Sequence, residues 1–219
     1  MSDTIINNLS ESTRLSPTIF YNQRAGELHI RVGPMFSGKT VYLNAQLTNW
    51  ADGPHNVNVL RIGHSMDIRK TAGFDAKNNI TSHSSSFATL SSKINTKSTD
   101  DLDKIDIENF DIIGIDEAQW FKELAKTVIN WLNQGKIIYI SSLDAYSNGN
   151  VCGEATQLIG YCSTFKKLTA DCVYCSELSH RRPAIITASR IKKNGNIHVG
   201  GSAEYAPACL NCHSQYNIN

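Results

Sequence analysis

The sequence predicts an α/β fold: a parallel sheet that carries a phosphate-binding loop (P-loop) is flanked by helices and followed by a small zinc-ribbon-like domain. Two observations predict the larger part. Apolar strand patterns alternate with helical patterns over residues 27–170, and a glycine-rich motif stands between the first strand and the first helix. A third observation, two Cys-x-x-Cys pairs within residues 171–219, predicts the small domain.

Composition narrows the class of protein. The 219 residues include 21 Lys and Arg against 20 Asp and Glu, so the formal net charge is +1. A net charge this small does not favour binding to nucleic acid or to an anionic membrane. The apolar stretches are far shorter than a bilayer span, and the N-terminal segment lacks the features of a secretory signal. We therefore expect a cytoplasmic protein with no nucleic-acid or membrane partner, in a compartment that keeps the six cysteines reduced.

The first elements of the larger domain follow a polar leader. Residues 1–26 are rich in Ser, Thr and Asn without a sustained period, which predicts a flexible N-terminal arm. Apolar residues alternate over 27–32, which predicts a strand. The helical pattern after it ends near the Asp-Gly-Pro at residues 52–54, and residues 57–62 predict a second strand.

The remaining elements of this domain come after a long polar segment. Residues 63–100 contain only scattered apolar side chains, which predicts a mobile functional loop. Residues 110–116 are nearly continuous in Ile and predict a strand buried in a parallel sheet. A helix is expected over 118–134 and a fourth strand over 136–143.

The motif between the first strand and the first helix fits the P-loop pattern G-x-x-x-x-G-K-[ST]. In such a loop, backbone N–H groups surround the β-phosphate, and Lys39 brings positive charge to the β- and γ-phosphates. The Thr40 hydroxyl can ligate Mg²⁺. A turn before an ordinary helix is the alternative, which the strand–loop–helix context disfavours. The predicted ATP-binding residues of the loop are Gly33, Pro34, Met35, Phe36, Ser37, Gly38, Lys39 and Thr40.

Two acidic residues end the Ile-rich strand. Asp116 stands where a carboxylate holds Mg²⁺ in P-loop enzymes, and Glu117 can accept a proton from an attacking hydroxyl or water. The alternative, that both acids only cap the next helix, is disfavoured by the P-loop upstream. Trp120 and Phe121 follow; one of two adjacent aromatics normally packs in the core, and one can stack on a base.

The two Cys-x-x-Cys pairs are separated by 33 residues. Four thiolates in this pattern suit tetrahedral Zn²⁺ with no open position, so the predicted site is structural. A redox pair is the alternative for one Cys-x-x-Cys, but two pairs favour a metal. Cys152 and Cys162 have no partner at metal spacing and are interpreted as small buried residues. The predicted zinc ligands are Cys172, Cys175, Cys209 and Cys212.

Together these motifs resemble the thymidine kinases of the cellular type-II kind, the zinc-containing family. The resemblance runs from about residue 28 to residue 216, and the P-loop is close to that family's own, including its Met-Phe pair. Residues 115–121, Ile-Asp-Glu-Ala-Gln-Trp-Phe, resemble the family's D-E-[AG]-Q-F-F. Residues 167–175 resemble its K-L-T-A-x-C-x-x-C, and residues 199–212 resemble its G-G-x-x-x-Y-x-x-x-C-x-x-C.

The resemblance implies transfer of the ATP γ-phosphate to the 5′-hydroxyl of thymidine, with Glu117 as the base and Asp116 holding Mg²⁺ beside Thr40. It also implies a homotetramer and feedback inhibition by thymidine triphosphate. Backbone groups in the glycine-rich segment can match the thymine edge, so deoxyuridine, which lacks only a methyl group, is expected to be a weaker substrate. By the same resemblance, further ATP contacts are Asp116, Gln119 and Arg69, and thymidine contacts are Met35, Trp120, Phe121, Gly200, Gly201 and Tyr205.

The chain departs from the family pattern in two places. Residues 144–147, Asp-Ala-Tyr-Ser, stand where the family usually has D-G-T-F, so an aromatic is displaced or lost. Residues 176–183 differ from the segment that commonly carries A-x-[FY]-T-x-R and contributes to the thymine pocket. These departures bear on base specificity and leave the phosphate chemistry unchanged.

Two other functions fit parts of the pattern. One is a P-loop ATPase with a zinc ribbon that acts on nucleic acid and uses Glu117 to activate water, and the near-zero net charge argues against it. The other is a kinase homologue that only binds nucleotide. Retention of Lys39, Thr40 and both acids argues against that function.

Overall fold

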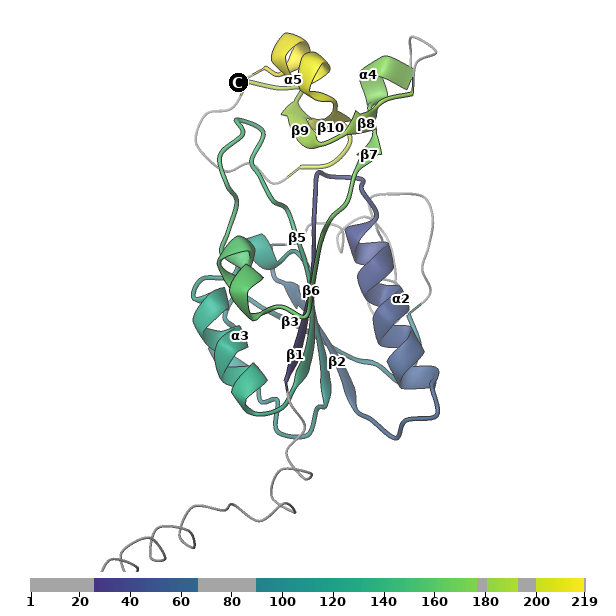
Figure 1. Ribbon diagram of the computed structural model, residues 1–219, viewed down its shortest axis with the longest axis vertical. Coiled ribbons are helices and arrows are strands. Elements are labelled where there is room, and N and C mark those ends of the chain that lie inside the picture. The colour runs from purple at the N-terminus through teal and green to yellow at the C-terminus, as the bar shows by residue number, and fades with distance from the viewer. Residues whose placement is uncertain (1–25, 67–89, 177–180, 193–199, 219) are drawn as a thin grey trace, which may run out of the picture.

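The core of the computed structural model is a six-stranded sheet in the order β3-β2-β4-β5-β1-β6 (Figure 1). Every neighbouring pair in this sheet is parallel, so all six strands end at the same edge. Helices lie on both faces, which confirms the predicted fold class. The predicted arm at residues 1–25 and residues 67–89 of the predicted loop lie outside the described residues. The structure describes residues 26–66, 90–176, 181–192 and 200–218.

The central strands coincide with the apolar segments of the sequence. The three strands β2, β4 and β5 are buried along their whole length, as expected for parallel strands covered on both faces. In β1, buried positions alternate with more exposed ones. The four predicted strands are thereby confirmed. Their bounds are Glu27–Val32 (β1), Val59–His64 (β2), Ile112–Ile115 (β4) and Ile137–Ser142 (β5).

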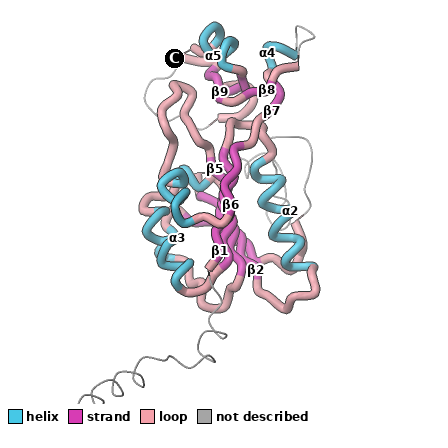
Figure 2. The backbone as a smooth tube through the Cα atoms, in the orientation of Figure 1, coloured by secondary structure: helices cyan, strands magenta, loops and turns pink. Residues whose placement is uncertain are grey.

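One helix covers each face of the sheet (Figure 2). On one face, α2 (Lys39–Asp52) packs Leu43 and Leu47 against Ile112 and Ile137. On the other face, α3 (Leu124–Asn133) shares a core cluster with β1, β4 and the 3-10 helix η4 (Ala155–Tyr161). Among the described residues, no helix is long and apolar enough to cross a membrane.

Two elements differ from the sequence-based expectation. Residues Asn95–Thr99, expected to belong to a mobile loop, form the edge strand β3 beside β2. All five residues, Asn-Thr-Lys-Ser-Thr, are polar or charged, because most of an edge strand faces solvent. The opposite edge strand, β6 (Thr164–Lys167), is likewise exposed at all four positions. A short 3-10 helix, η2 (Leu102–Lys104), follows β3.

The helix expected over 118–134 is interrupted after its first turn. A 3-10 turn, η3 (Ala118–Trp120), comes first, and α3 begins only at Leu124 after Glu123 adopts a φ of 53°. The carboxylate of Glu154 accepts hydrogen bonds from the backbone N–H groups of Glu123 (3.2 Å) and Ala125 (3.0 Å). This distant side chain satisfies N–H groups at the start of α3, which allows the helix to begin late.

The cysteine pairs lie in a small unit above the carboxyl edge of the sheet (Figure 1). Its two antiparallel strand pairs are β7–β8 and β9–β10, and its core consists of the four cysteines of the two pairs with three alanines. The elements are β7 (Ala170–Asp171), α4 (Val173–Ser176), β8 (Pro183–Ala184), β9 (Ile186–Ser189), β10 (Tyr205–Ala208) and α5 (Leu210–Tyr216).

Candidate active site

The P-loop joins β1 to α2 at the carboxyl edge of the sheet. At Gly33 a Cβ atom would lie 2.5 Å from the carbonyl oxygen of Leu168, so only glycine fits there. Phe36 has a φ of 65°, a backbone conformation that is uncommon for a non-glycine residue. The Lys39 Nζ donates a 2.7 Å hydrogen bond to the Pro34 carbonyl oxygen, so the ammonium group lies against the loop's own backbone.

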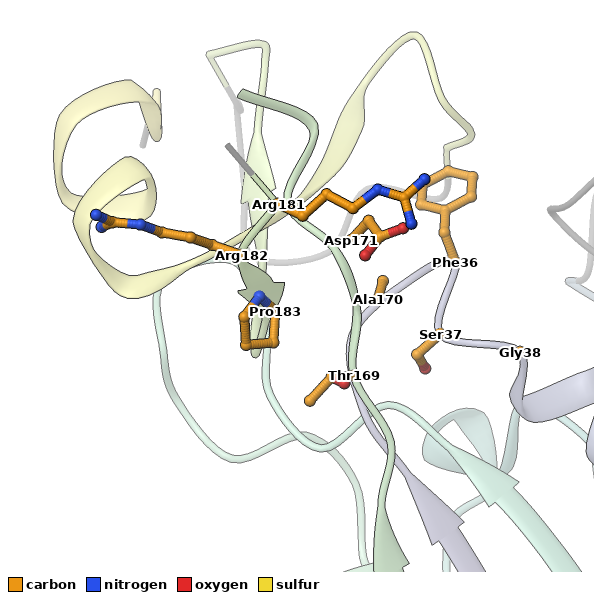
Figure 3. A pocket seen from close by; sticks show the side chains of 9 residues that line it. All are labelled: Phe36, Ser37, Gly38, Thr169, Ala170, Asp171, Arg181, Arg182 and Pro183. Carbon is orange, nitrogen blue, oxygen red and sulfur yellow. The ribbon is translucent and has the colours of Figure 1, made fainter. Parts of the chain in front are cut away.

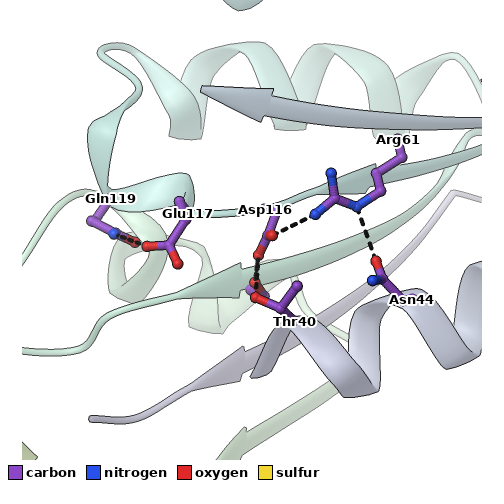
Figure 4. A network of polar contacts seen from close by, with 7 residues as sticks. Thr40, Asn44, Arg61, Asp116, Glu117 and Gln119 are labelled. Atoms are coloured by element: carbon purple, nitrogen blue, oxygen red, sulfur yellow. Dashed lines mark hydrogen bonds and ion pairs between the residues drawn. The ribbon is translucent and has the colours of Figure 1, made fainter. Parts of the chain in front are cut away.

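Asp116 is 1% exposed and lies at the centre of a buried polar network (Figure 4). Its Oδ1 accepts hydrogen bonds from the hydroxyls of Thr40 (3.1 Å) and Ser141. Its Oδ2 accepts from Arg61 Nη2 at 2.6 Å, and Arg61 Nε donates to Asn44 Oδ1 at 2.9 Å. The structure therefore brings together the two residues predicted to hold Mg²⁺ and adds a buried arginine beside them.

The sequence analysis missed Arg61. It lies inside the apolar strand β2, and a single charged residue there carries no spacing signal. Only the pairing of β2 with β4, whose C-terminal end leads to Asp116, brings the guanidinium to the carboxylate. An arginine stays protonated at any physiological pH, so a permanent cation faces the buried Asp116 carboxyl group at 2.6 Å.

We expect Arg61→Met to lower the free energy of unfolding by about 3–5 kcal/mol, because the buried Asp116 carboxylate loses its cation. Arg61→Lys keeps the charge and is expected to cost less. The control, Lys166→Met on the exposed strand β6, should stay within about 0.5 kcal/mol of the parent. Denaturant unfolding measures all three, and parent-like stability of Arg61→Met would show that the pair contributes nothing.

Glu117 follows directly, with φ 52° and ψ 43° in the left-handed region. Non-glycine residues in that region are strained, and such residues cluster at functional sites. Its Oε2 accepts a 2.5 Å hydrogen bond from Gln119 Nε2. The other end of that amide, Oε1, accepts from the backbone N–H of Leu143 at 2.9 Å. Gln119, predicted to contact ATP, thus links Glu117 to the end of β5.

The two aromatics after Gln119 lie in different environments. Phe121 is 2% exposed and packs in the core, with its ring 4.8 Å from the ring of His64 in an edge-to-face contact. Its burial agrees with the interpretation that one of the two adjacent aromatics is a core residue. That Phe121 contacts thymidine stays a prediction. Trp120 is half-buried. Arg69 lies outside the described residues.

A hydrogen bond connects the P-loop to the small unit. The backbone N–H of Met35 donates to the Thr187 hydroxyl at 2.9 Å, and both residues are buried. Thr187 lies in β9 opposite Pro207 of β10, the strand that begins with Tyr205. Just before β10, the N–H of Gly201 donates to Glu204 Oε2 at 2.7 Å. The residues predicted to contact thymidine at 200–205 are therefore joined to the loop through Thr187, which the sequence analysis did not single out.

Residues 144–147, the first of the two segments that depart from the family pattern, lie between the two units. The Ser147 carbonyl oxygen accepts hydrogen bonds from His213 Nε2 (2.7 Å) and Asn217 Nδ2 (3.0 Å) of the C-terminal segment. The Tyr146 side chain bonds to the thiol of Cys152, whose pKa burial raises to about 11. That thiol is buried, as predicted, and burial favours its protonated, less reactive form.

The four remaining cysteines form one cluster. Their Sγ atoms all lie within 4.8 Å of one another, and all four residues are buried, so they can hold a single metal ion. The backbone N–H of Cys212 lowers the pKa of the Cys209 thiol to about 7, whereas burial raises the pKa values of Cys175 and Cys212. Four thiolates this close together repel one another unless a cation lies between them. A structural zinc site supplies such a cation and takes four cysteine ligands. Cys162 is half-buried and lies outside the cluster.

Fold and site together define a P-loop nucleotide-binding protein with a second, four-cysteine unit that can hold a metal ion. A family model described as thymidine kinase matches residues 26–213, and the chain therefore belongs to the thymidine kinase family, whose members are kinases.

Several proteins that are similar to this chain are named thymidine kinase. The thymidine kinase of sheeppox virus (strain KS-1) is 32% identical over 189 residues, which cover 86% of this chain and 97% of the viral protein. The thymidine kinase of rabbit fibroma virus (strain Kasza) is 29% identical over 191 residues, covering 86% and 96%. Thymidine kinase 1 of Dictyostelium discoideum is 28% identical over 192 residues, covering 88% and 79%.

Proposed function

We propose that the protein transfers the γ-phosphate of ATP to the 5′-hydroxyl of thymidine and so produces thymidine monophosphate for deoxynucleotide synthesis. The observation that carries this proposal is the placement of Asp116 and Glu117 at the same sheet edge as the P-loop. Membership of the thymidine kinase family supports thymidine as the acceptor.

Each residue of the site has a separate task in this reaction. Lys39 and the P-loop N–H groups bind the β- and γ-phosphates, and Glu117 accepts the proton of the 5′-hydroxyl. The oxygen of that hydroxyl forms the new bond to the γ-phosphorus while the bond to the β-phosphate oxygen breaks, and ADP leaves. Thr40 and Asp116 would hold Mg²⁺, which neutralises phosphate charge; their oxygens, 3.1 Å apart, suit a hard cation.

The thymine base would lie between Trp120 and the 200–205 segment, with Met35 at the P-loop side. Backbone groups there would match the O4, N3–H and O2 edge of thymine, whereas cytosine would leave them unpaired. A panel of nucleosides with Mg²⁺-ATP tests this assignment. We expect thymidine to be the best substrate, deoxyuridine to be weaker, and deoxycytidine and purine nucleosides to be nearly inert. Equal phosphorylation of deoxycytidine would contradict the proposed base recognition.

Structural Zn²⁺ in the cysteine cluster is part of the proposal. The unit around it is small, so metal affinity should appear as folding free energy. We expect about one zinc per chain, and Cys172→Ser to lower the melting temperature by about 5–10 °C, roughly 2–3 kcal/mol.

The matched control is Cys162→Ser, the same exchange at a half-buried position outside the cluster. It should retain zinc and melt within about 2 °C of the parent. Metal-free protein with full stability and activity would contradict the structural role of zinc.

The family resemblance also suggests a homotetramer, feedback inhibition by thymidine triphosphate and a cytoplasmic location. The six thiols, all free among the described residues, are compatible with a reducing compartment. Light scattering with and without thymidine triphosphate would measure the oligomeric state, and inhibition kinetics would measure the feedback.

A further inference from the structure

Arg61 is a buried cation at the proposed metal site, and no step of the proposed reaction uses it. Its side chain is 2% exposed, and every residue of β2 is buried. Nη2 donates to Asp116 Oδ2 at 2.6 Å, and Nε donates to Asn44 Oδ1 at 2.9 Å (Figure 4). The guanidinium is therefore held at two points and faces the carboxylate with a permanent positive charge.

Both oxygens of Asp116 have partners inside the protein. Oδ2 accepts a hydrogen bond from Arg61, and Oδ1 accepts from the hydroxyls of Thr40 and Ser141. A carboxylate offers about four acceptor positions, so these bonds use most of them. A further position on Oδ2 lies beside the guanidinium, whose charge repels a metal ion. The Thr40 hydroxyl differs, because an oxygen that donates its proton keeps lone pairs for a cation.

The formal charges around this network balance without a metal. Lys39 and Arg61 each carry one positive charge, and Asp116 and Glu117 are the two acids at the end of β4. Mg²⁺ gives up its water reluctantly and is usually held by one or two carboxylates together with substrate phosphates. A triphosphate chain brings several negative charges to this balanced site. The metal therefore becomes favourable when the phosphates arrive.

The network is also closed toward the pocket beside the P-loop. That pocket has a volume of about 480 Å³ and is lined by residues 36–38, 169–171 and 181–183 (Figure 3). Of the residues that the structure describes, neither Arg61 nor Asp116 lines this pocket, and both side chains are almost completely buried. An ion in the pocket therefore does not contact the carboxylate.

We propose that Arg61 is a built-in counter-cation for Asp116: it occupies the carboxylate in the nucleotide-free protein, so that a divalent cation binds there only together with the phosphates of the donor. The proposal rests on the proposed function, in which Thr40 and Asp116 hold the metal of bound ATP. Arg61 acts through Asp116 and is a positioning residue. Removal of its charge should therefore create a metal site in the protein without nucleotide.

The test measures binding of Mn²⁺, which prefers the same oxygen ligands as Mg²⁺ and is counted by electron paramagnetic resonance. The full-length protein is titrated without nucleotide. We expect weak binding by the parent and binding at least about tenfold tighter by Arg61→Gln, whose amide can donate a hydrogen bond but carries no charge. Arg61→Lys keeps the charge and should stay within about threefold of the parent.

The matched control is Arg31→Gln, the same exchange on β1, where the guanidinium donates to the Tyr42 hydroxyl at 3.0 Å. It should bind Mn²⁺ as the parent does. Circular dichroism at the working temperature checks that each variant is folded. A variant that is only destabilised has no reason to gain metal affinity, so a gain in Arg61→Gln reports the lost charge.

Three results would overturn the proposal. The first needs no variant: if the nucleotide-free parent bound Mn²⁺ within about tenfold of its affinity with ATP present, Arg61 would not keep the metal out. The second is unchanged Mn²⁺ affinity in folded Arg61→Gln. The third is an equal gain in Arg61→Lys, which would assign the effect to geometry and not to charge. Failure of the proposed function would appear separately, as parent protein that binds Mn²⁺ with ATP and transfers no phosphate to thymidine.

Discussion

Glu117→Gln is expected to lower turnover by about 10²–10⁴, the usual contribution of a positioned general base. The amide has nearly the shape of the carboxylate, and its oxygen can still accept the hydrogen bond that Gln119 donates at 2.5 Å. The variant therefore keeps the orientation of the side chain and loses only its basicity. ATP affinity should stay nearly unchanged, because neither Lys39 nor the P-loop is altered. Steady-state kinetics and calorimetry measure the two quantities.

The matched control is Glu123→Gln, the same exchange at an exposed acid six residues further along. Its carboxylate contacts Lys126 at 3.2 Å on the surface, so its loss should change turnover less than about twofold. If Glu117→Gln kept more than a tenth of the parent's turnover, Glu117 would not be the base.

Lys39→Ala is expected to reduce both ATP affinity and turnover, with kcat/KM for ATP falling by about 10²–10³. The ammonium group lies at the P-loop and is 7% exposed, so little water replaces it when the side chain is removed. Its charge meets the phosphates in the ground state and stabilises the charge that develops during transfer. Both binding and rate should therefore fall.

Lys166→Ala serves as the control for Lys39→Ala, because Lys166 is an exposed lysine on the edge strand β6. We expect parent-like kinetics from it. If Lys39→Ala left ATP affinity and turnover unchanged, the P-loop would not be part of the ATP-binding site.

The parts of the site that the sequence predicts are those whose chemistry is contained in neighbouring residues. The P-loop needs glycines, a lysine and a threonine at fixed spacing, and Asp116 needs only to follow a buried strand. The two Cys-x-x-Cys pairs carry their own spacing signal, and the structure brings their sulfur atoms within 4.8 Å of one another. Apolar runs likewise predicted the buried strands.

The parts that the sequence does not predict depend on contacts between distant residues. Arg61 bonds to a residue 55 positions away, and Thr187 bonds to the backbone of Met35, 152 positions away. Strand β3 is polar because it is an edge, so its pairing with β2 left no apolar pattern to detect. The late start of α3 depends on the carboxylate of Glu154, which lies 29 positions after the Ala125 N–H that it caps.

The most direct measurement is the fate of the labelled γ-phosphate when the full-length protein is mixed with Mg²⁺-ATP and thymidine. We expect one labelled phosphate on the 5′-oxygen of thymidine for each ATP consumed, and almost none released to water. Label found only in inorganic phosphate, with no thymidine monophosphate formed, would contradict the kinase reaction and favour a P-loop ATPase.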